Sequence, residues 1–337
     1  MSEERYGLLA GGNFIVDRVK TVDHYPAQDN LATILRESRS NGGGPYNVLK
    51  DLAAMGVPYP LEAAGLVGQD SDGDWIAADC AGHGICTRQL HRSGDAPTSY
   101  TDVMSSAESG RRTFFHQRGT NAFLDHEHFD FSLSRARLFH FGYLMLLDRF
   151  DRFDDAGTCP AAILLSRARE AGFETSVDFV STPHPEFRAI ACAILPQVDH
   201  LILNEIEAGM ILDKTLDPGD MIGLGHAAFM LLEGGVNKSV VIHFETGAVA
   251  ITPGHTAFYQ PSLHLPPGYC QGATGAGDAF AAGYLHGVHE SAPLDARLRL
   301  AMCTAAASLS HPTSSQGLRP LAGCLELADI YPWRASV

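Results

Sequence analysis

A chain of 337 residues is too long for one minimal domain and short for two large ones, so one large α/β domain with a small appendage is expected. Apolar residues make up 45% of the sequence, which is ordinary for a soluble globular protein and argues against disorder. The formal net charge of -15, without any run of lysine or arginine, argues against nucleic acid as a partner.

The first part of the chain alternates between strands and helices. Apolar runs predict buried strands over residues 6–16 and 59–66. Helices are predicted over residues 45–55, directly after a run of glycines, and over residues 72–83, with Ser71 as the N-cap. A strand, a glycine loop and a helix in succession are the opening of an α/β unit.

Two segments interrupt this alternation. Residues 97–118 alternate between polar and apolar side chains around a turn at Glu108, Ser109 and Gly110, which predicts a β-hairpin. Residues 16–40 also lack helical periodicity. We therefore group about 16–40 and 97–118 into a small β lid that could cover a site.

The alternation resumes in the second half of the chain. Strands are predicted near 138–142, 174–179, 199–203 and 239–243, and helices near 160–171 and 221–232. A glycine-rich turn then opens a helix of small residues, and a further helix runs through 298–308. This order predicts a mostly parallel central sheet with helices on both faces, whose ligands gather at the carboxyl ends of the strands.

Nothing in the sequence suggests a membrane or a metal-ligand motif. The first residues lack the features of a secretion signal, and no apolar stretch reaches the roughly 18 residues of a membrane span, so a cytoplasmic location is the default. The seven cysteines include no Cys-x-x-Cys pair and are expected to be reduced, mostly buried thiols. Residues 125–128 (DHEH) and His140 invite a metal assignment, but without ligand spacing a polar loop and a strand histidine are preferred.

The strongest local signal is the segment Gly272-Ala273-Thr274-Gly275-Ala276-Gly277-Asp278. Its glycines let the backbone turn tightly and aim several N–H groups at one point, and the helix that begins there adds the positive end of its dipole. Such a nest binds anions. The segment has neither the lysine of a P-loop nor the last glycine of a dinucleotide motif, since Phe280 stands there. By itself, Asp278 is either a reactive group or only a favourable charge at a helix start.

An aspartate at the mouth of an anion nest has a specific use. A hydroxyl that attacks a phosphoryl group loses its proton as the bond forms, while the nest stabilises negative charge on the transferred group. With an ordinary pKa of about 4, the aspartate is a weak base and must act late, in concert with bond formation.

These residues resemble the second signature of the ribokinase-like, or PfkB, family of carbohydrate kinases. The resemblance implies that Gly275, Ala276 and Gly277 form an anion hole and that Asp278 is the catalytic base. Thr274, Gly275 and Gly277 are also expected to contact ATP. The implied fold is ribokinase-like, with the mostly parallel sheet and the small β lid described above.

The resemblance extends upstream to a first signature, Gly42-Gly43-Gly44-Pro45-Tyr46-Asn47. In the family its glycine pair and asparagine hold sugar hydroxyls, so Gly43, Gly44 and Asn47 are expected to bind the substrate. The segment containing Asn13 and Asp17 resembles the end of the family's first strand, where an aspartate accepts hydrogen bonds from the substrate. Asp17 is the first choice for that role, and a solvated loop aspartate is the alternative.

A third match is Asn204-Glu205-Ile206-Glu207, which resembles the family's Asn-x-x-Glu motif. Its glutamate helps to arrange hydrated Mg²⁺ near the phosphates, so Glu207 is expected to act on the metal through water and Asn204 to belong to the cofactor site. The alternative is a helix-start carboxylate that interacts with the dipole. ATP and Mg²⁺ are the implied cofactors.

Some positions depart from the family pattern. Gly272 replaces the usual Asp or Asn, which puts activation by a monovalent cation such as K⁺ in doubt. The strand VVIHFETGAVAI, residues 240–251, has His243-Phe244-Glu245 where a Thr-x-Gly turn often faces the nucleotide, so the nucleotide preference is open. Tyr46 replaces a common alanine, and its phenol could stack on the sugar or crowd it.

The arginines of the hairpin are Arg111, Arg112 and Arg118. One of them entering the site could select an acidic or phosphorylated sugar by bidentate contact, and Arg118 is the first candidate. The alternative is that all three are exposed lid charges.

The sequence therefore predicts a single ribokinase-like kinase domain over residues 1–337 that uses ATP to phosphorylate a hydroxyl of a sugar or sugar-like molecule. One alternative is a nucleoside kinase with an adenosine-like substrate, since Tyr46, Phe114 and Phe115 would allow base stacking. Another is a non-catalytic sugar-binding regulator, against which the retained Asp278 argues. The exposed edges of the lid would also permit a homodimer.

Overall fold

The computed structural model describes residues 5–109 and 111–335, and nine strands among them form one large sheet. These strands are β1 (Leu8–Gly12), β4 (Leu61–Gly68), β5 (Cys86–Ser93), β8 (Leu138–Leu144), β9 (Glu174–Phe179), β10 (His200–Asn204), β11 (Ser239–Phe244), β12 (Gly247–Ile251) and β13 (Phe258–Pro261). Their order is β13-β12-β11-β10-β9-β8-β1-β4-β5. All neighbours from β5 to β11 pair in parallel, whereas β12 and β13 extend the edge by antiparallel pairing.

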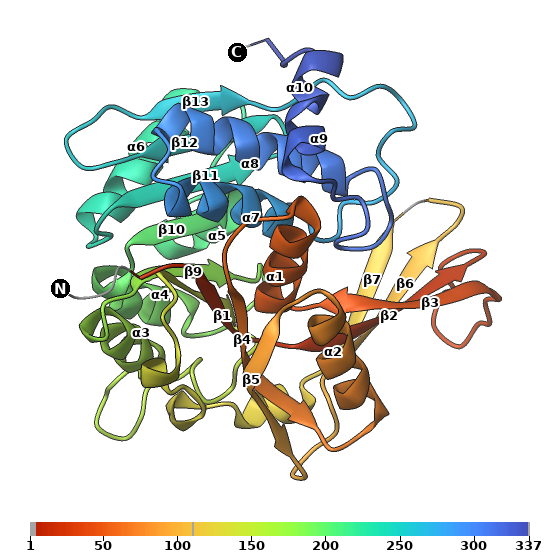
Figure 1. Ribbon diagram of the computed structural model, residues 1–337. Helices are drawn as coiled ribbons and strands as arrows, with labels where there is room; N and C mark the ends of the chain where they lie inside the picture. Colours follow the sequence, from red (N-terminus) through yellow and green to blue (C-terminus); the bar gives the residue numbers. More distant parts are fainter. Residues whose placement is uncertain (1–4, 110, 336–337) are drawn as a thin grey trace.

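Helices cover both faces of this sheet (Figure 1). The helices are α1 (Gly44–Met55), α2 (Ser71–Gly82), α3 (Pro160–Glu170), α4 (Phe187–Ile194), α5 (Glu205–Leu212), α6 (Met221–Glu233), α7 (Ala276–His289), α8 (Leu294–Ser308), α9 (Leu321–Leu325) and α10 (Leu327–Ile330). Single 3₁₀ turns lie at Gly119–Phe123, His126–His128, Phe131–Leu133 and Leu195–Gln197. The predicted parallel α/β architecture is confirmed.

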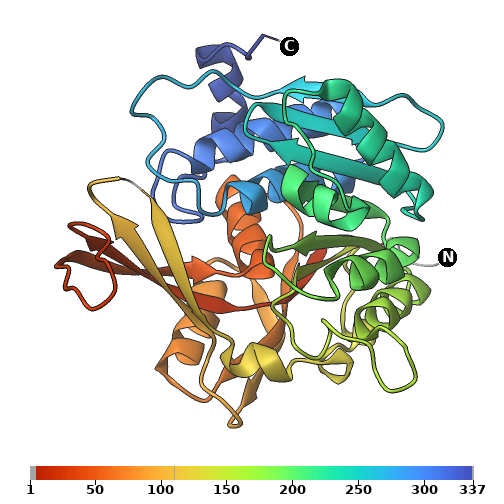
Figure 2. The ribbon, with the colours of Figure 1, turned by 180° about the vertical axis from the view of Figure 1, so that it is seen from behind.

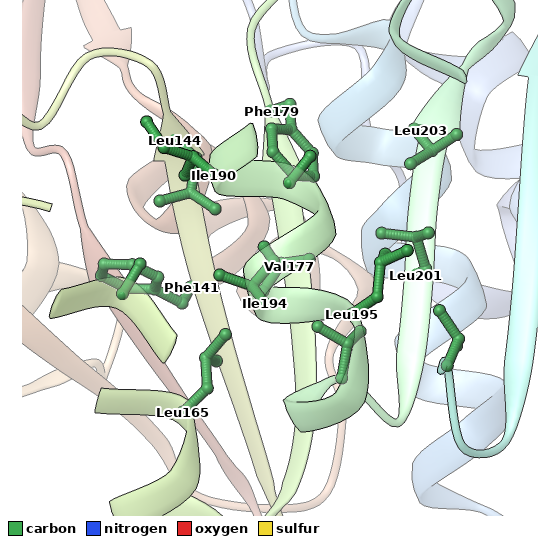
Figure 3. Close-up of a cluster of buried hydrophobic side chains, with 14 of the residues drawn as sticks. Phe141, Leu144, Leu165, Val177, Phe179, Ile190, Ile194, Leu195, Leu201 and Leu203 are labelled. Atoms are coloured by element: carbon green, nitrogen blue, oxygen red, sulfur yellow. The ribbon is translucent and has the colours of Figure 1, made fainter. Parts of the chain in front are cut away.

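Alternation along the strands divides the apolar side chains between two cores. In β1, Leu9 joins the core under α3 to α6, whereas Leu8 and Ala10 face the core under α1, α2, α7 and α8. Figure 3 shows part of the first core, where side chains of β8, β9 and β10 meet those of α3 and α4. Strands buried on both faces are typical of a parallel sheet between two helix layers.

A second sheet projects from one side of the molecule (Figures 1 and 2). Its strands are β2 (Ile15–Val22), β3 (Ile34–Gly42), β6 (Tyr100–Ser106) and β7 (Arg112–Gln117), in the order β3-β2-β6-β7. The central pair, β2 and β6, is parallel and joins the two segments that we grouped from the sequence. Gly110, in the predicted hairpin turn, lies outside the described residues.

The structure corrects three local predictions. The first predicted strand is two strands, because the chain leaves the large sheet after Gly12 and enters the small one at Ile15. Asp70, not Ser71, caps α2, since its Oδ1 accepts a hydrogen bond from the N–H of Gly73 at 2.8 Å. Residues 240–251 form a hairpin of β11 and β12 rather than one strand.

The helices of the described part of the chain, residues 5–109 and 111–335, are all too short or too polar to cross a bilayer.

Candidate active site

The carboxyl ends of four neighbouring strands open into one cavity of about 690 Å³. The strands β8, β9, β10 and β11 contribute Tyr143, Asp178, Asn204 and His243 to its wall. The glycine turn before α7 forms another wall, and Arg112 and Phe114 of β7 border the cavity from the small sheet. The site thus lies where a parallel sheet is expected to collect its ligands.

A second cavity of about 720 Å³ adjoins the first. Both cavities are bordered by His243, Gly272, Ala273 and Gly277. The second is lined mainly by apolar side chains, among them Leu263, Leu265, Phe280, Met302 and Leu309. The glycine turn therefore stands between two cavities, so two ligands could meet at the turn.

Asp278 lies in the first turn of α7 and is only 3% exposed. The phenol O–H of Tyr143 donates to its two carboxylate oxygens at 2.6 and 2.7 Å, and the amide of Asn47 donates to Oδ2 at 2.8 Å. Burial raises the pKa of Asp278 to about 6, against these two hydrogen bonds, which lower it. The carboxylate is therefore a stronger base than an ordinary aspartate and is still charged at pH 7.

Tyr143 covers this carboxylate. Its ring lies against Gly44, where a Cβ atom would come within 2.9 Å of the ring, and its N–H donates to Oδ1 of Asn13. Burial and the charge of Asp278 raise the pKa of Tyr143, so the phenol keeps its proton. An O–H donor is thus already seated on Asp278, which shows that the carboxylate can accept a hydroxyl hydrogen at this place.

Five of the predicted substrate residues are brought together: Asn13, Asp17, Gly43, Gly44 and Asn47. Gly43 has a φ of 90° and packs against the backbone of Asn13, so the turn before α1 requires glycine. These residues are buried next to Tyr143 and Asp278 rather than on the wall of the 690 Å³ cavity. Tyr143 contacts Asn13 and Gly44 on one side and borders the cavity on the other.

Asp17 lies on β2 of the small sheet and is 8% exposed. Burial, followed by the charge of Asp278, raises its pKa to about 8, although Thr101 and Arg112 lower it. Two buried carboxylates, one on the small sheet and one on α7, therefore interact without full compensation of their charges. Hydrogen bonds from the hydroxyl groups of a ligand would stabilise these buried carboxylates.

The Asn-x-x-Glu motif caps the N-terminus of α5. Oδ1 of Asn204 accepts from the N–H of Glu207 at 2.8 Å, and Oε2 of Glu207 accepts from the N–H of Asn204 at 3.0 Å. The hydroxyl of Ser181 donates to Oε1 of Glu207 at 2.8 Å. Glu207 is thus a helix-capping carboxylate, the alternative considered above, and it also borders the 690 Å³ cavity.

Asp178 and Glu207 form an acidic pair in this cavity. Burial raises the pKa of Glu207 to about 7, and burial together with the charge of Glu207 raises that of Asp178 well above its usual value. Within residues 5–109 and 111–335, no three or more His, Cys, Asp or Glu side chains are grouped to hold a metal ion. A two-carboxylate site fits a cation that keeps much of its water, as Mg²⁺ does.

The glycines of the turn have different structural reasons. Gly275 has a φ of 79°, and a Cβ atom there would lie 2.7 Å from Cα of Ser314. A Cβ on Gly277 would meet only the ring of His243 at 3.6 Å, so packing does not require glycine at that position. Because Gly277 borders both cavities, its missing side chain leaves room for a ligand between them.

Residues 8–319 match the family described as pfkB family carbohydrate kinase. The chain belongs to this family. None of the curated proteins compared with the chain matches it.

Solved structures resemble this pfkB-family chain over nearly its whole length. A ribokinase from Thermotoga maritima is 19% identical over 96% of this chain and 99% of its own, with a TM-score of 0.78. An Arabidopsis thaliana ribokinase complexed with ribose and ATP is 19% identical over 96% of this chain and 98% of its own, with a TM-score of 0.78. A nucleoside kinase from Methanocaldococcus jannaschii is 15% identical over 96% of this chain and 98% of its own, with a TM-score of 0.73. The fold is therefore ribokinase-like.

Two side chains that the sequence analysis considered near the substrate, Arg118 and Tyr46, do not border the 690 Å³ cavity. Arg118 pairs with Asp148 at 2.6 Å and donates to the carbonyl of Met145, whereas Arg112 is the hairpin arginine that borders the cavity. Tyr46 is fully buried beside Phe14, and its hydroxyl donates to Asp79, so it faces the core rather than a sugar.

The sequence analysis gave no role to Tyr143, Asp178 or Asn41. Tyr143 and Asp178 stand near the carboxyl ends of β8 and β9, so scanning the ends of the predicted strands for polar side chains would have found them. Asn41 donates to Asn47 at 2.7 Å and to Ser315 at 2.9 Å. No local pattern announces it, because its contact with Ser315 spans most of the chain.

Proposed function

We propose that this pfkB-family chain is an ATP-dependent kinase that phosphorylates a hydroxyl group of a sugar or sugar-like small molecule. The observation that carries the proposal is the Asp278 carboxylate, which holds an O–H donor beside a glycine turn that two cavities share. A base next to an anion nest is what phosphoryl transfer to an alcohol requires. The structure described as an Arabidopsis ribokinase with ribose and ATP supports this pair of substrates.

In the proposed reaction, Asp278 accepts the proton of the acceptor hydroxyl while the acceptor oxygen bonds to the γ-phosphorus. The bond between that phosphorus and the bridging oxygen breaks, and ADP leaves with the electron pair. The backbone of Gly275, Ala276 and Gly277, at the start of α7, stabilises the charge on the transferred group. The N–H of Ala276 donates to the Ala273 carbonyl at 3.3 Å and contributes through the helix dipole. Thr274 and Asn204 complete the nucleotide side of the site.

Asp178 and Glu207 would hold magnesium through its water shell, since they form the acidic pair of the phosphate-side cavity. Mg²⁺ supplies positive charge that neutralises the phosphates and makes ADP a better leaving group.

The acceptor is held by Asn13, Asp17, Gly43, Gly44 and Asn47, in the roles that the family resemblance gives them. Its reacting hydroxyl takes the place of the Tyr143 phenol as the donor to Asp278. Movement of that ring opens the region above Gly44 to the sugar.

The small sheet acts as a lid in this proposal, with residues 1–337 as one kinase domain and the lid at about 16–40 and 97–118. It contributes Asp17 to the acceptor side and Arg112 and Phe114 to the cavity wall. Closure over both substrates would exclude water, which otherwise competes with the sugar as phosphoryl acceptor.

A nucleoside kinase is the second candidate. Phe114 borders the 690 Å³ cavity and could stack on a base, whereas Phe115 alternates to the other side of β7 and Tyr46 is in the core. The Methanocaldococcus nucleoside kinase shows that the fold occurs in a protein described by this activity.

The deciding experiment measures ADP release from Mg·ATP with each member of a panel of sugars, sugar acids and nucleosides. Turnover with one class of acceptor identifies a kinase and separates the two candidates. Silence across the panel, together with thermal stabilisation by a ligand, would instead indicate a binding protein that has lost turnover.

Omission of magnesium should abolish turnover, and Glu207→Gln should raise the magnesium concentration required for half-maximal turnover.

Tyr143→Phe tests how the base is tuned. Loss of the phenol removes a hydrogen bond that lowers the pKa of Asp278, so this pKa should rise above about 6. Because the base acts in its charged form, the acidic limb of the kcat/KM profile should move to higher pH. Tyr6→Phe, which removes an exposed phenol bonded to the Pro58 carbonyl, is the control. An unmoved limb, or one shifted to lower pH, would contradict the assignment.

We also propose that two copies pair through the lid. Leu31, Leu35 and Phe115 of the small sheet and its loop are each more than half exposed, although all three are apolar. Light scattering at micromolar concentration should give the mass of two chains for the wild type and of one chain for Phe115→Glu. Ile222→Glu, at an exposed position on α6, should remain paired. A monomeric wild type would rule the lid dimer out.

A further inference from the structure

Arg112 connects three parts of the chain that are far apart in sequence. Its guanidinium leaves β7 of the small sheet and donates through Nη1 to the hydroxyl of Thr274, in the glycine turn. Through Nη2 it donates to the carbonyl of Pro312 at 2.9 Å, in the loop after α8. The same side chain borders the cavity that contains Asp278.

The guanidinium occupies space that a side chain at Gly272 would need. A Cβ atom built on Gly272 would overlap Nη2 of Arg112 and would lie 3.1 Å from its Cζ. Gly272 is not among the glycines with positive φ, so its backbone conformation does not demand glycine. The same Cβ atom would lie 3.0 Å from Cα of Pro312, so the glycine is explained by the close approach of both Arg112 and the Pro312 loop.

The surroundings of the guanidinium resemble those of a bound cation. Its two partners are a hydroxyl oxygen and a carbonyl oxygen, which are hard donors of the kind that bind alkali and alkaline-earth ions. Burial lowers the pKa of Arg112 and the charge of Asp17 raises it, and an arginine in a protein remains charged. A fixed positive charge therefore lies beside the turn that carries Gly275 and Gly277.

We propose that Arg112 is a positioning residue that replaces a monovalent metal ion: delivered by the small sheet, its guanidinium holds the Gly272–Gly275 turn against the Pro312 loop, and phosphoryl transfer needs no K⁺. The inference rests on the proposed kinase activity for its kinetic part. It also makes the anion site depend on lid closure, since Thr274 and Pro312 lose their cation when β7 moves away.

The test compares the wild type with Arg112→Ala, Arg112→Lys and Arg36→Ala, an exposed arginine of the same sheet. Initial rates are measured in potassium, sodium and tetramethylammonium chloride at equal ionic strength. Wild-type and Arg36→Ala rates should agree within about twofold among these salts. In Arg112→Ala, kcat should fall about 100-fold, whereas KM should change by a smaller factor. Potassium or millimolar guanidinium should restore part of the lost kcat. Arg112→Lys, which keeps the charge, should fall between them.

Three results would overturn the proposal: a wild type that requires potassium, an Arg112→Ala variant with wild-type kcat, or an impaired variant that no small cation improves. A second readout does not need turnover. Potassium chloride, replacing tetramethylammonium chloride, should raise the Tm of Arg112→Ala but not that of the wild type. If no acceptor in the panel is phosphorylated, the proposed function fails, and this thermal titration still decides the role of Arg112.

Discussion

Asp278→Asn is expected to lower kcat by about 10³-fold while the protein keeps its fold and its ligands, because general base catalysis contributes on that order. Asparagine has nearly the shape of aspartate, and its amide oxygen can still accept a hydrogen bond from Tyr143 or Asn47. The amide cannot take up the proton of the acceptor hydroxyl. The loss should therefore appear in the chemical step rather than in substrate binding.

The measurement combines steady-state ADP release with the shift in Tm that each substrate produces. Asp295→Asn is the matched control, because Asp295 is an exposed acidic residue in the first turn of α8. It makes the same change of charge at a helix start that borders neither of the two cavities described above. A variant that loses turnover and keeps ligand binding would exclude the non-catalytic regulator. Turnover by Asp278→Asn within about tenfold of the wild type would remove Asp278 from the proposed role.

Above pH 8, where Asp17 is charged, Asp17→Asn is expected to lower kcat/KM by about 10- to 100-fold, because hydrogen bonds between a carboxylate and substrate hydroxyls are lost. The carboxylate lies on β2 of the lid, close enough to Asp278 for their charges to interact. The substitution keeps the shape of the side chain but weakens its acceptor strength. Asp102→Asn, on the neighbouring strand β6, is the control for activity.

The same substitution should stabilise the free protein in a pH-dependent manner. The pKa of Asp17 is raised to about 8 in the folded protein, above about 4 in the unfolded chain, so its folded form keeps the proton more tightly between these values. The tighter proton binding makes no difference to stability below pH 4, where Asp17 is protonated in both states. Above pH 4 the wild type loses stability, until Asp17 ionises in the folded protein near pH 8. Asparagine avoids the loss, so the gain in stability should be near zero at pH 4 and on the order of a few kcal/mol at pH 8.

Thermal unfolding between pH 4 and pH 8 measures this gain. If Asp17→Asn loses activity and its stability relative to the wild type increases with pH, Asp17 is retained for ligand binding although it destabilises the free protein. A gain independent of pH, or largest at pH 4, would contradict the assigned titration. Unchanged kcat/KM would show that the acceptor does not contact Asp17.

Local sequence was sufficient for features that depend on nearby residues. The glycine turn and the helix that starts at Ala276 could be predicted, because a positive φ at Gly275 and an anion nest are properties of a few consecutive residues. Alternation of strands and helices predicted the parallel sheet, and the sheet then predicted that ligands gather at the strand ends. The capping box of Asn204 and Glu207 is likewise a pattern of four residues.

The choice among the hairpin arginines could not be made from the sequence. Arg112 and Arg118 have the same parity along the chain, so alternation in β7 does not separate them. β7 ends at Gln117, and Arg118 falls in the following turn, where it pairs with Asp148. How far the small sheet extends over the large one decides which arginine reaches Thr274.

Local patterns in the sequence were therefore enough to predict the fold class, the family and the glycine turn that carries Asp278, since periodicity and glycine turns are set by neighbours along the chain. Only the tertiary structure placed Tyr143 on Asp278, Tyr46 in the core and Arg112 over Gly272. Each of these contacts joins segments that the fold brings together from distant parts of the chain. Side-chain direction and strand length fix such contacts, and no local pattern of residue types specifies them.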